Sequence, residues 1–109
     1  MKLIVMRGES RGRSYLIEEG SNLIGRWDAD SGAFPEIDLE DQDPENKVSR
    51  KHAIIEKTGG TVTIEDVGSR NGTYINRGPR LEEGVKHELV DGDEIVVGKV
   101  FMKFQTEDS

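Results

Sequence analysis

Residues 52–65 read HAIIEKTGGTVTIE, and this stretch decides the fold class. Its second half, residues 61–65, alternates polar and apolar residues, so that Val62 and Ile64 share one face of a β-strand. Its first half also has strand character, with two adjacent Ile residues. The segment Thr58-Gly59-Gly60-Thr61 stands between the two halves and is a turn of the kind that joins antiparallel strands. The stretch therefore predicts a β-hairpin.

The same strand pattern extends over most of the chain. Short segments rich in β-branched or aromatic residues lie at 2–6, 14–17, 22–25, 37–39, 73–75, 87–90, 94–97 and 100–105. Turn-forming residues separate them, and Asp91-Gly92 predicts another tight turn. No window sustains the apolar period of about 3.6 residues that marks an amphipathic helix. About ten short strands with regular turns predict an all-β sandwich or barrel.

Length and composition predict a single domain. The chain has 109 residues and no Cys, which excludes a disulfide scaffold, a thiolate zinc site and a cysteine nucleophile. Domains most often have about 100–150 residues, so we expect one domain over residues 1–109, with its core at about 3–104 and a polar tail at 105–109. No apolar run is long enough for a membrane helix, which needs about 20 residues. We expect a cytoplasmic protein that is monomeric as an isolated domain and does not bind membranes.

The charges are arranged in blocks. The formal net charge is −7, and the acidic loop, residues 27–46, carries eight carboxylates with no Lys or Arg. Most of the basic residues that follow lie between positions 47 and 80. An acidic chain is a poor binder of nucleic acid, because phosphates require a positive field. A local basic site can still bind one phosphate, although charge blocks are often only solvated faces.

Catalytic and metal-binding motifs are not supported. A calcium loop beginning at Asp28 fails, because Ala33 and Leu39 occupy the positions that require Gly and Glu. The two His residues have no partners at the spacing of zinc ligands. Ser49 and His52 are three residues apart, whereas a catalytic triad is assembled from distant positions. We therefore expect no enzymatic activity, no metal and no cofactor.

Polar residues suited to binding an anion fall in three predicted loops. Arg26 closes one strand, Ser49 precedes another, and the sequence DVGSRNGT at 66–73 follows the hairpin. Loops gather at the ends of a β-sandwich, so these groups can converge and offer a guanidinium, a hydroxyl and an amide to a phosphorylated peptide. Taken singly, each has a plainer interpretation. Arg26 can pair with the acidic loop, Ser49 can satisfy its own turn, and Asn71-Gly72 can be a hairpin turn.

Together, these segments resemble the forkhead-associated (FHA) domain family. Gly25-Arg26, Ser49–His52, Asp66–Thr73 and Leu89–Gly98 occur in the family's order and at similar spacing, and the resemblance extends from Leu3 to about Phe104. It implies a β-sandwich of about eleven mostly antiparallel short strands, with ligand-binding loops at one end.

The resemblance also implies a function. FHA domains are non-catalytic modules that recognise phosphothreonine in kinase signalling. The partner is then a protein or peptide that a Ser/Thr kinase has phosphorylated. The alternative is a structural or scaffolding domain that binds its partners independently of phosphate.

Individual residues receive roles from the same resemblance. Arg26 corresponds to the arginine that holds the phosphate, and Ser49 to the serine whose hydroxyl hydrogen-bonds it. Arg50 stands where the family often places a residue that touches phosphate or peptide. Arg70 replaces a Thr or Ser that touches the phosphate in many members, and either adds a cation or points to solvent. Asn71 corresponds to the asparagine that binds the peptide backbone.

Five further residues are expected to support the site. His52 corresponds to the histidine that braces the binding loops. Gly25, Gly68 and Gly72 fit positions that need a positive φ or a close backbone approach. Asn76 is expected to tie its loop to a neighbouring strand.

The acidic loop leaves three interpretations open. It can contact peptide residues beside the phosphothreonine and favour basic ones. It can be a solvated insertion that repels anions. It can also occupy the chain's own basic site when no ligand is bound.

Overall fold

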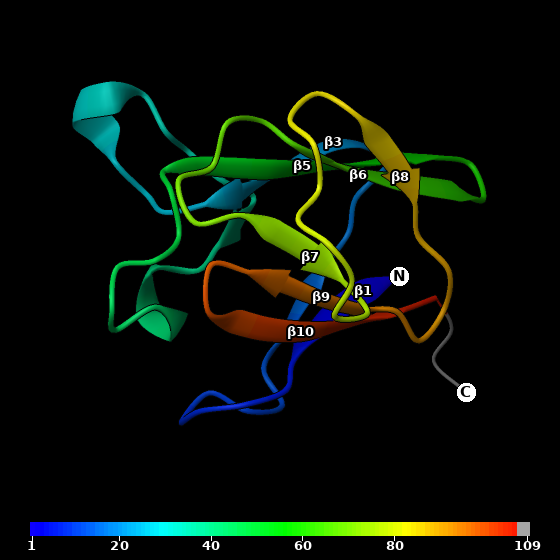
Figure 1. Cartoon of the computed structure of the whole chain (residues 1–109), viewed down its shortest axis with the longest axis horizontal. Coiled ribbons are helices and arrows are strands. Elements are labelled where there is room, and N and C mark those ends of the chain that lie inside the picture. Colours follow the sequence, from blue (N-terminus) through cyan, green and yellow to red (C-terminus); the bar gives the residue numbers. More distant parts are fainter. Residues whose placement is uncertain (107–109) are drawn as a thin grey trace.

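The computed structural model describes residues 1–106, and ten strands form within them (Figure 1). The strands are β1 (Lys2–Val5), β2 (Ser14–Leu16), β3 (Gly20–Gly25), β4 (Ile37–Asp38), β5 (Lys51–Thr58), β6 (Thr61–Asp66), β7 (Thr73–Ile75), β8 (Lys86–Glu88), β9 (Glu94–Val97) and β10 (Val100–Gln105). Two short 3-10 helices, η1 (Ala29–Ser31) and η2 (Glu40–Gln42), lie within the acidic loop. The strands form two five-stranded sheets, in the orders β2-β1-β10-β9-β7 and β4-β3-β5-β6-β8. All pairs are antiparallel except β3 with β4. The predicted all-β sandwich is confirmed, with one strand fewer than the approximate eleven.

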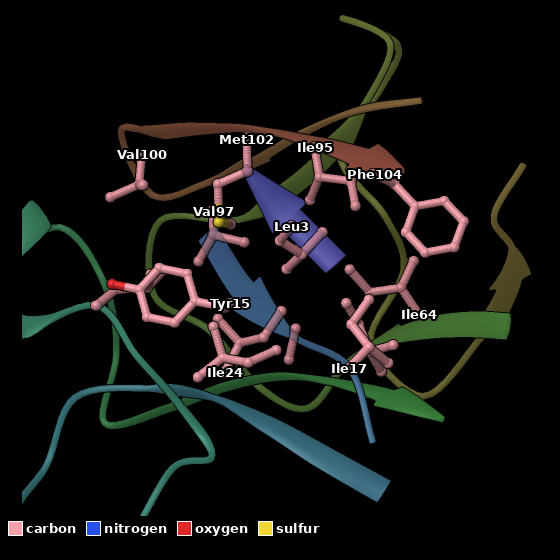
Figure 2. Packing of buried hydrophobic residues seen from close by; sticks show 14 of the residues in the cluster. Leu3, Tyr15, Ile17, Ile24, Ile64, Ile95, Val97, Val100, Met102 and Phe104 are labelled. Carbon is pink, nitrogen blue, oxygen red and sulfur yellow. The ribbon is translucent and has the colours of Figure 1, made fainter. Parts of the chain in front are cut away.

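The two sheets bury one apolar core between them (Figure 2). Alternate residues of the strands point inward, and Leu3, Ile24, Ile64, Ile95 and Phe104 are fully buried. Burying side chains of this size stabilises the fold by about 1.5–3 kcal/mol each. The core thus holds the strand ends, and the loops that leave them, in fixed positions.

The predicted hairpin at the centre of the sequence is confirmed. Thr58 lies opposite Thr61, so that Gly59 and Gly60 alone form the loop between β5 and β6. Gly59 has φ 61°, a left-handed conformation that glycine adopts without steric cost. No helix among the described residues is long and apolar enough to cross a membrane.

Three predictions near the C-terminus need correction. The strand expected at 87–90 is β8, which ends at Glu88 because the Asp93 carboxylate already accepts the Val90 amide at 2.9 Å and the chain is turning there. The Asp91-Gly92 turn is present, but β8 and β9 belong to different sheets, so it is a crossover between sheets. Gln105 is the last residue of β10, which confirms the strand predicted at 100–105 and moves the start of the expected polar tail beyond it. Residues 107–109 lie outside the described part of the chain.

The strand pairing brings several loops to one end of the sandwich, on the left of Figure 1. β3 and β5 run antiparallel with Gly25 opposite Lys51, and β5 and β6 pair antiparallel in turn. The end of β3, the start of β5 and the end of β6 therefore lie side by side. In the other sheet Thr73, at the start of β7, lies opposite Val97, at the end of β9. The predicted convergence of the three polar loops follows from this topology.

Candidate functional site

A cavity of about 380 Å³ opens where these loops meet. Its lining consists of Arg26, Asn46, Lys47, Val48, Ser49, Arg50, Arg70 and Asn71. All five residues predicted to touch a ligand are in this set. Four of the eight lining residues are cationic and none is acidic, although the chain as a whole has a net charge of −7. The lining is therefore suited to an anion.

Arg26 is positioned by the backbone around Ser49. A Cβ on Gly25 would lie 1.8 Å from the Arg50 carbonyl oxygen, so only glycine permits this approach. The Arg26 amide donates to that same oxygen at 3.2 Å. The Arg26 Nε donates to the Val48 carbonyl at 2.5 Å. Its two Nη groups form no hydrogen bond with other described residues, so they can bind a ligand.

A buried carboxylate shapes the loop under Arg26. Asp43 accepts hydrogen bonds from the amides of Lys47 at 2.8 Å and Val48 at 2.9 Å. Its Oδ2 also lies 3.9 Å from the Arg26 Nε. The plainer interpretation of Arg26 as a partner of the acidic loop is thus correct in part. Sequence reasoning treated Asp43 only as one of eight acidic charges. Its place before a Pro-containing turn was the signal for a structural role.

His52 links two of the converging loops. It is fully buried; its Nδ1 accepts from the Ser49 amide at 3.0 Å, and its Nε2 donates to the Gly72 carbonyl at 2.8 Å. This pair of bonds requires the neutral ring with its proton on Nε2. The Ser49 hydroxyl accepts from the Arg70 amide at 3.0 Å and joins the same loops a second time. The bracing position expected for His52 is present.

Acid is expected to destabilise the protein through His52. Burial lowers the pKa of His52, whereas a histidine in the unfolded chain titrates at about 6.5. The unfolded state therefore binds a proton more readily, and stability falls as the pH drops below about 6.5. We expect the free energy of unfolding to fall by up to about 1.4 kcal/mol per pH unit in that range. Urea titrations at pH 7.5, 6.5 and 5.5 measure this slope.

The matched controls for this prediction use both histidines. His52→Gln should flatten the slope, and His87→Gln, at a partly exposed position on β8, should keep it. Asp66, whose pKa is also shifted, loses its contribution only at pH values below about 4, outside this window. An unchanged slope in His52→Gln would contradict the assignment.

A second buried carboxylate organises the loop between β6 and β7. Asp66 Oδ1 accepts from the amides of Gly68 and Ser69 at 2.9 Å each, and Oδ2 accepts from the hydroxyls of Ser69 at 2.5 Å and Thr73 at 2.7 Å. Burial raises the pKa of Asp66, but these hydrogen bonds outweigh it and hold the pKa below its usual value. Sequence reasoning included Asp66 only as the first residue of the segment 66–73 and gave it no role of its own. The structure gives it no hydrogen bond to His52.

Two glycines and an arginine complete this loop. Gly68 and Gly72 have φ values of 106° and 92°, as expected for positions that favour glycine. The Arg80 Nη2 donates to the Ser69 carbonyl at 2.7 Å, a support that the sequence did not reveal. The loop joins strands of different sheets, so the hairpin alternative for Asn71-Gly72 is wrong.

The remaining predicted site residues differ in whether their side chains are already bound to other residues. The Asn71 Nδ2 donates to the Lys47 carbonyl at 2.9 Å, and its Oδ1 accepts no hydrogen bond from residues 1–106. The Arg50 Nε lies 2.5 Å from Asp28 Oδ2, an ion pair with the acidic loop. The Arg70 side chain forms no ion pair with any residue from 1 to 106. Of the four lining cations, Arg50 is held in a close ion pair, so Arg26, Lys47 and Arg70 are the more available to a ligand.

Asn76 lies away from the cavity, beyond the far end of β7. Its Nδ2 donates to Asp93 Oδ1 at 2.9 Å, and its Oδ1 accepts from the Glu94 amide at 2.9 Å. It therefore ties its loop to β9, as expected. Asn76 therefore supports the cavity only indirectly, through the sheet.

Comparisons with known proteins agree with this arrangement. The family described as FHA domain matches residues 22–98. The oxoglutarate dehydrogenase inhibitor of Corynebacterium diphtheriae is 37% identical over 94% of this chain, and the glycogen accumulation regulator GarA of Mycolicibacterium smegmatis is 38% identical over 95%. The chain spans 62% and 58% of those two proteins. A solved structure from work on phosphothreonine-dependent FHA domain interactions superposes with a TM-score of 0.77 and 31% identity, over 99% of this chain and 97% of the other.

The family match covers most of the chain, including the end of β3, the cavity loops and β9. The chain therefore belongs to the forkhead-associated domain family.

Proposed function

We propose that this chain binds a phosphothreonine-containing segment of a partner protein, with the phosphate in the cavity between the loops. The observation that carries the proposal is the cavity's lining of four cations and a serine hydroxyl on an otherwise acidic chain. A phosphate carries a charge of about −1.5 to −2 at pH 7 and three acceptor oxygens. Arg26, Ser49, Arg50 and Arg70 are proposed to bind it.

The hydrogen-bond donors of the cavity lining that have no partner among the described residues suit a phosphate. The Nη groups of Arg26 can form charge-assisted hydrogen bonds with two phosphate oxygens. The Ser49 hydroxyl oxygen accepts from the Arg70 amide, so its own proton remains available for a third. The unphosphorylated threonine would leave these donors without an anion, and discrimination should be large.

Asn71 is proposed to hold the peptide backbone. Its Nδ2 is already used by the Lys47 carbonyl, and its Oδ1 is therefore the atom that can accept a peptide amide. This contact would fix an extended peptide beside the phosphate without reading a side chain.

Asp28 is expected to compete for Arg50. Its carboxylate lies 2.5 Å from the Arg50 Nε, on an arginine that is largely exposed. A bound phosphate would have to share Arg50 with it or displace it. Such exposed pairs contribute about 0–1 kcal/mol, so the competition is modest.

The biological role follows from the same proposal. Residues 1–109 are proposed to be one non-catalytic domain, monomeric by itself, that recognises the product of a Ser/Thr kinase in the cytoplasm without a cofactor. Two similar proteins are named as an inhibitor and a regulator, which favours control through binding.

Titration with a degenerate phosphothreonine peptide library tests the proposal. We expect micromolar binding and a loss of about 100-fold with the unphosphorylated library. Amide resonances of Ser49 and Asn71 should shift, whereas that of Gly59, at the opposite end of the sandwich, should not. No binding by a folded protein would favour the alternative of a phosphate-independent scaffold domain.

A further inference from the structure

An exposed aromatic pair projects from the acidic loop. Trp27 and Phe34 are 53% and 52% exposed, and their ring centroids lie 4.9 Å apart at an interplanar angle of 69°. Aromatic rings of this size bury a large area when they find a partner, and leaving two in water gives up that stabilisation. Neither the core nor the proposed phosphate contacts explain their position.

The backbone holds the pair in place. Asp28 and Ala33 form an isolated antiparallel bridge with two hydrogen bonds of 2.9 Å, so Trp27 and Phe34 flank the neck of a small hairpin. The Asp28 side chain accepts from the Asp30 amide at 3.1 Å and caps η1 within it. Ala33 is fully buried and anchors the neck. Figure 1 shows this hairpin standing out from the sandwich at the end where the binding loops meet.

The pair borders the proposed phosphate cavity. Trp27 directly follows Arg26, and Asp28 contacts Arg50, which also lines the cavity. An extended peptide advances about 3.3–3.6 Å per residue, so a side chain within about four residues of the phosphothreonine can reach the rings.

The charge around the two rings indicates which kind of peptide side chain would bind them. The loop that carries them has eight carboxylates and no cation of its own. Asp30 is exposed and forms no ion pair within the described residues, and Glu36 is exposed two positions after Phe34. Aromatic faces attract cations through the ring quadrupole, and nearby carboxylates add to the attraction. This chain already packs Arg7 over Phe101, 3.8 Å from the ring centroid.

We propose that Trp27 and Phe34 form a subsite for an Arg or Lys side chain of the phosphopeptide. The inference rests on the proposed function and adds a preference for a basic residue near the phosphothreonine. The rings supply the faces on which a guanidinium stacks, and the acidic loop supplies the field. Of the three interpretations of the acidic loop, this is the first, in which the loop contacts peptide residues beside the phosphothreonine and favours basic ones.

An Arg scan of the peptide tests the subsite. Each peptide carries one phosphothreonine in an Ala and Ser background, with a single Arg at one of about four positions on either side. We expect one or two positions at which Arg binds about three- to tenfold tighter than Gln, and at which Glu binds weaker than Gln. The Trp27→Ala/Phe34→Ala double variant should lose this preference and leave the affinity for the Gln peptides unchanged.

Two further variants separate a cation subsite from a merely apolar contact surface. Trp27→Leu/Phe34→Leu keeps an apolar surface without the rings, and it too should lose the preference. Leu16→Ala removes another exposed apolar side chain, on β2, and should keep it.

Each result of the scan decides a different point. Phosphate-dependent binding with a flat profile, or with a preference for Leu or Met, overturns the subsite and leaves the proposed function standing. No binding to any phosphopeptide overturns both.

Discussion

Replacing Arg26 by Ala is expected to weaken phosphothreonine-peptide binding by at least about 100-fold. The variant removes a guanidinium that lines the cavity and whose Nη groups are proposed to bind the phosphate. A desolvated ionic contact of this kind commonly contributes several kcal/mol to a complex. Isothermal titration calorimetry with a phosphopeptide selected from the library measures the change.

The control must separate binding from folding, because Arg26 also has structural contacts. Its Nε donates to the Val48 carbonyl and lies near buried Asp43. Arg26→Lys keeps the charge without the planar fork and should lose less, about tenfold. Arg77→Ala, whose exposed guanidinium pairs with Glu94 away from the cavity lining, serves as the matched arginine control and should keep the affinity. An Arg26→Ala protein that is folded and still binds within a few-fold of the original affinity would contradict the proposed phosphate contact.

Replacing Asp66 by Ala is expected to lower the free energy of unfolding by about 3–5 kcal/mol. The Asp66 carboxylate accepts four hydrogen bonds, two from amides and two from the buried hydroxyls of Ser69 and Thr73. Without it these donors remain buried and unpaired, and each unsatisfied group costs about 1–3 kcal/mol. Urea denaturation at pH 7 measures the loss.

Two controls test whether the hydrogen bonds are the cause. Glu65→Ala removes an equal charge from the neighbouring, partly exposed position of β6 and should change stability by less than about 1 kcal/mol. Asp66→Asn keeps one acceptor oxygen for the amides and should lose less than Asp66→Ala. Equal losses in Glu65→Ala and Asp66→Ala would show that overall charge, and not this network, is responsible.

The fold was predictable because its signals are local. Alternation in residues 61–65 and the Gly59-Gly60 turn specify a hairpin whatever the rest of the chain does. The errors fell where tertiary contacts decide an element's end. The Val90 amide is taken by Asp93 instead of a neighbouring strand, so β8 ends early. Nothing in the sequence near Asp91-Gly92 shows that the chain crosses from one sheet to the other.

The residues that line the candidate site were predictable from the sequence, but the carboxylates that hold its loops in place were not predicted. Arg26, Ser49, Arg50, Arg70 and Asn71 were selected from a resemblance, and all of them line one cavity. Their individual roles remain predictions. Of the two carboxylates that shape the loops, Asp43 had a local signal in the turn that follows it. Nothing in the sequence around Asp66 shows that its carboxylate is buried.

By itself, the sequence determined the strand pattern, the all-β class and the set of polar residues between strands, because turn chemistry and side-chain alternation act over a few neighbouring positions. The tertiary structure decided which of those residues meet. Antiparallel pairing of β3, β5 and β6 brings Arg26 and Ser49 to one end, and Asp43 and His52 fix the loops there through buried hydrogen bonds. The bond from His52 to the Gly72 carbonyl joins positions that are 20 residues apart, so no local pattern can indicate it, and its burial strengthens it.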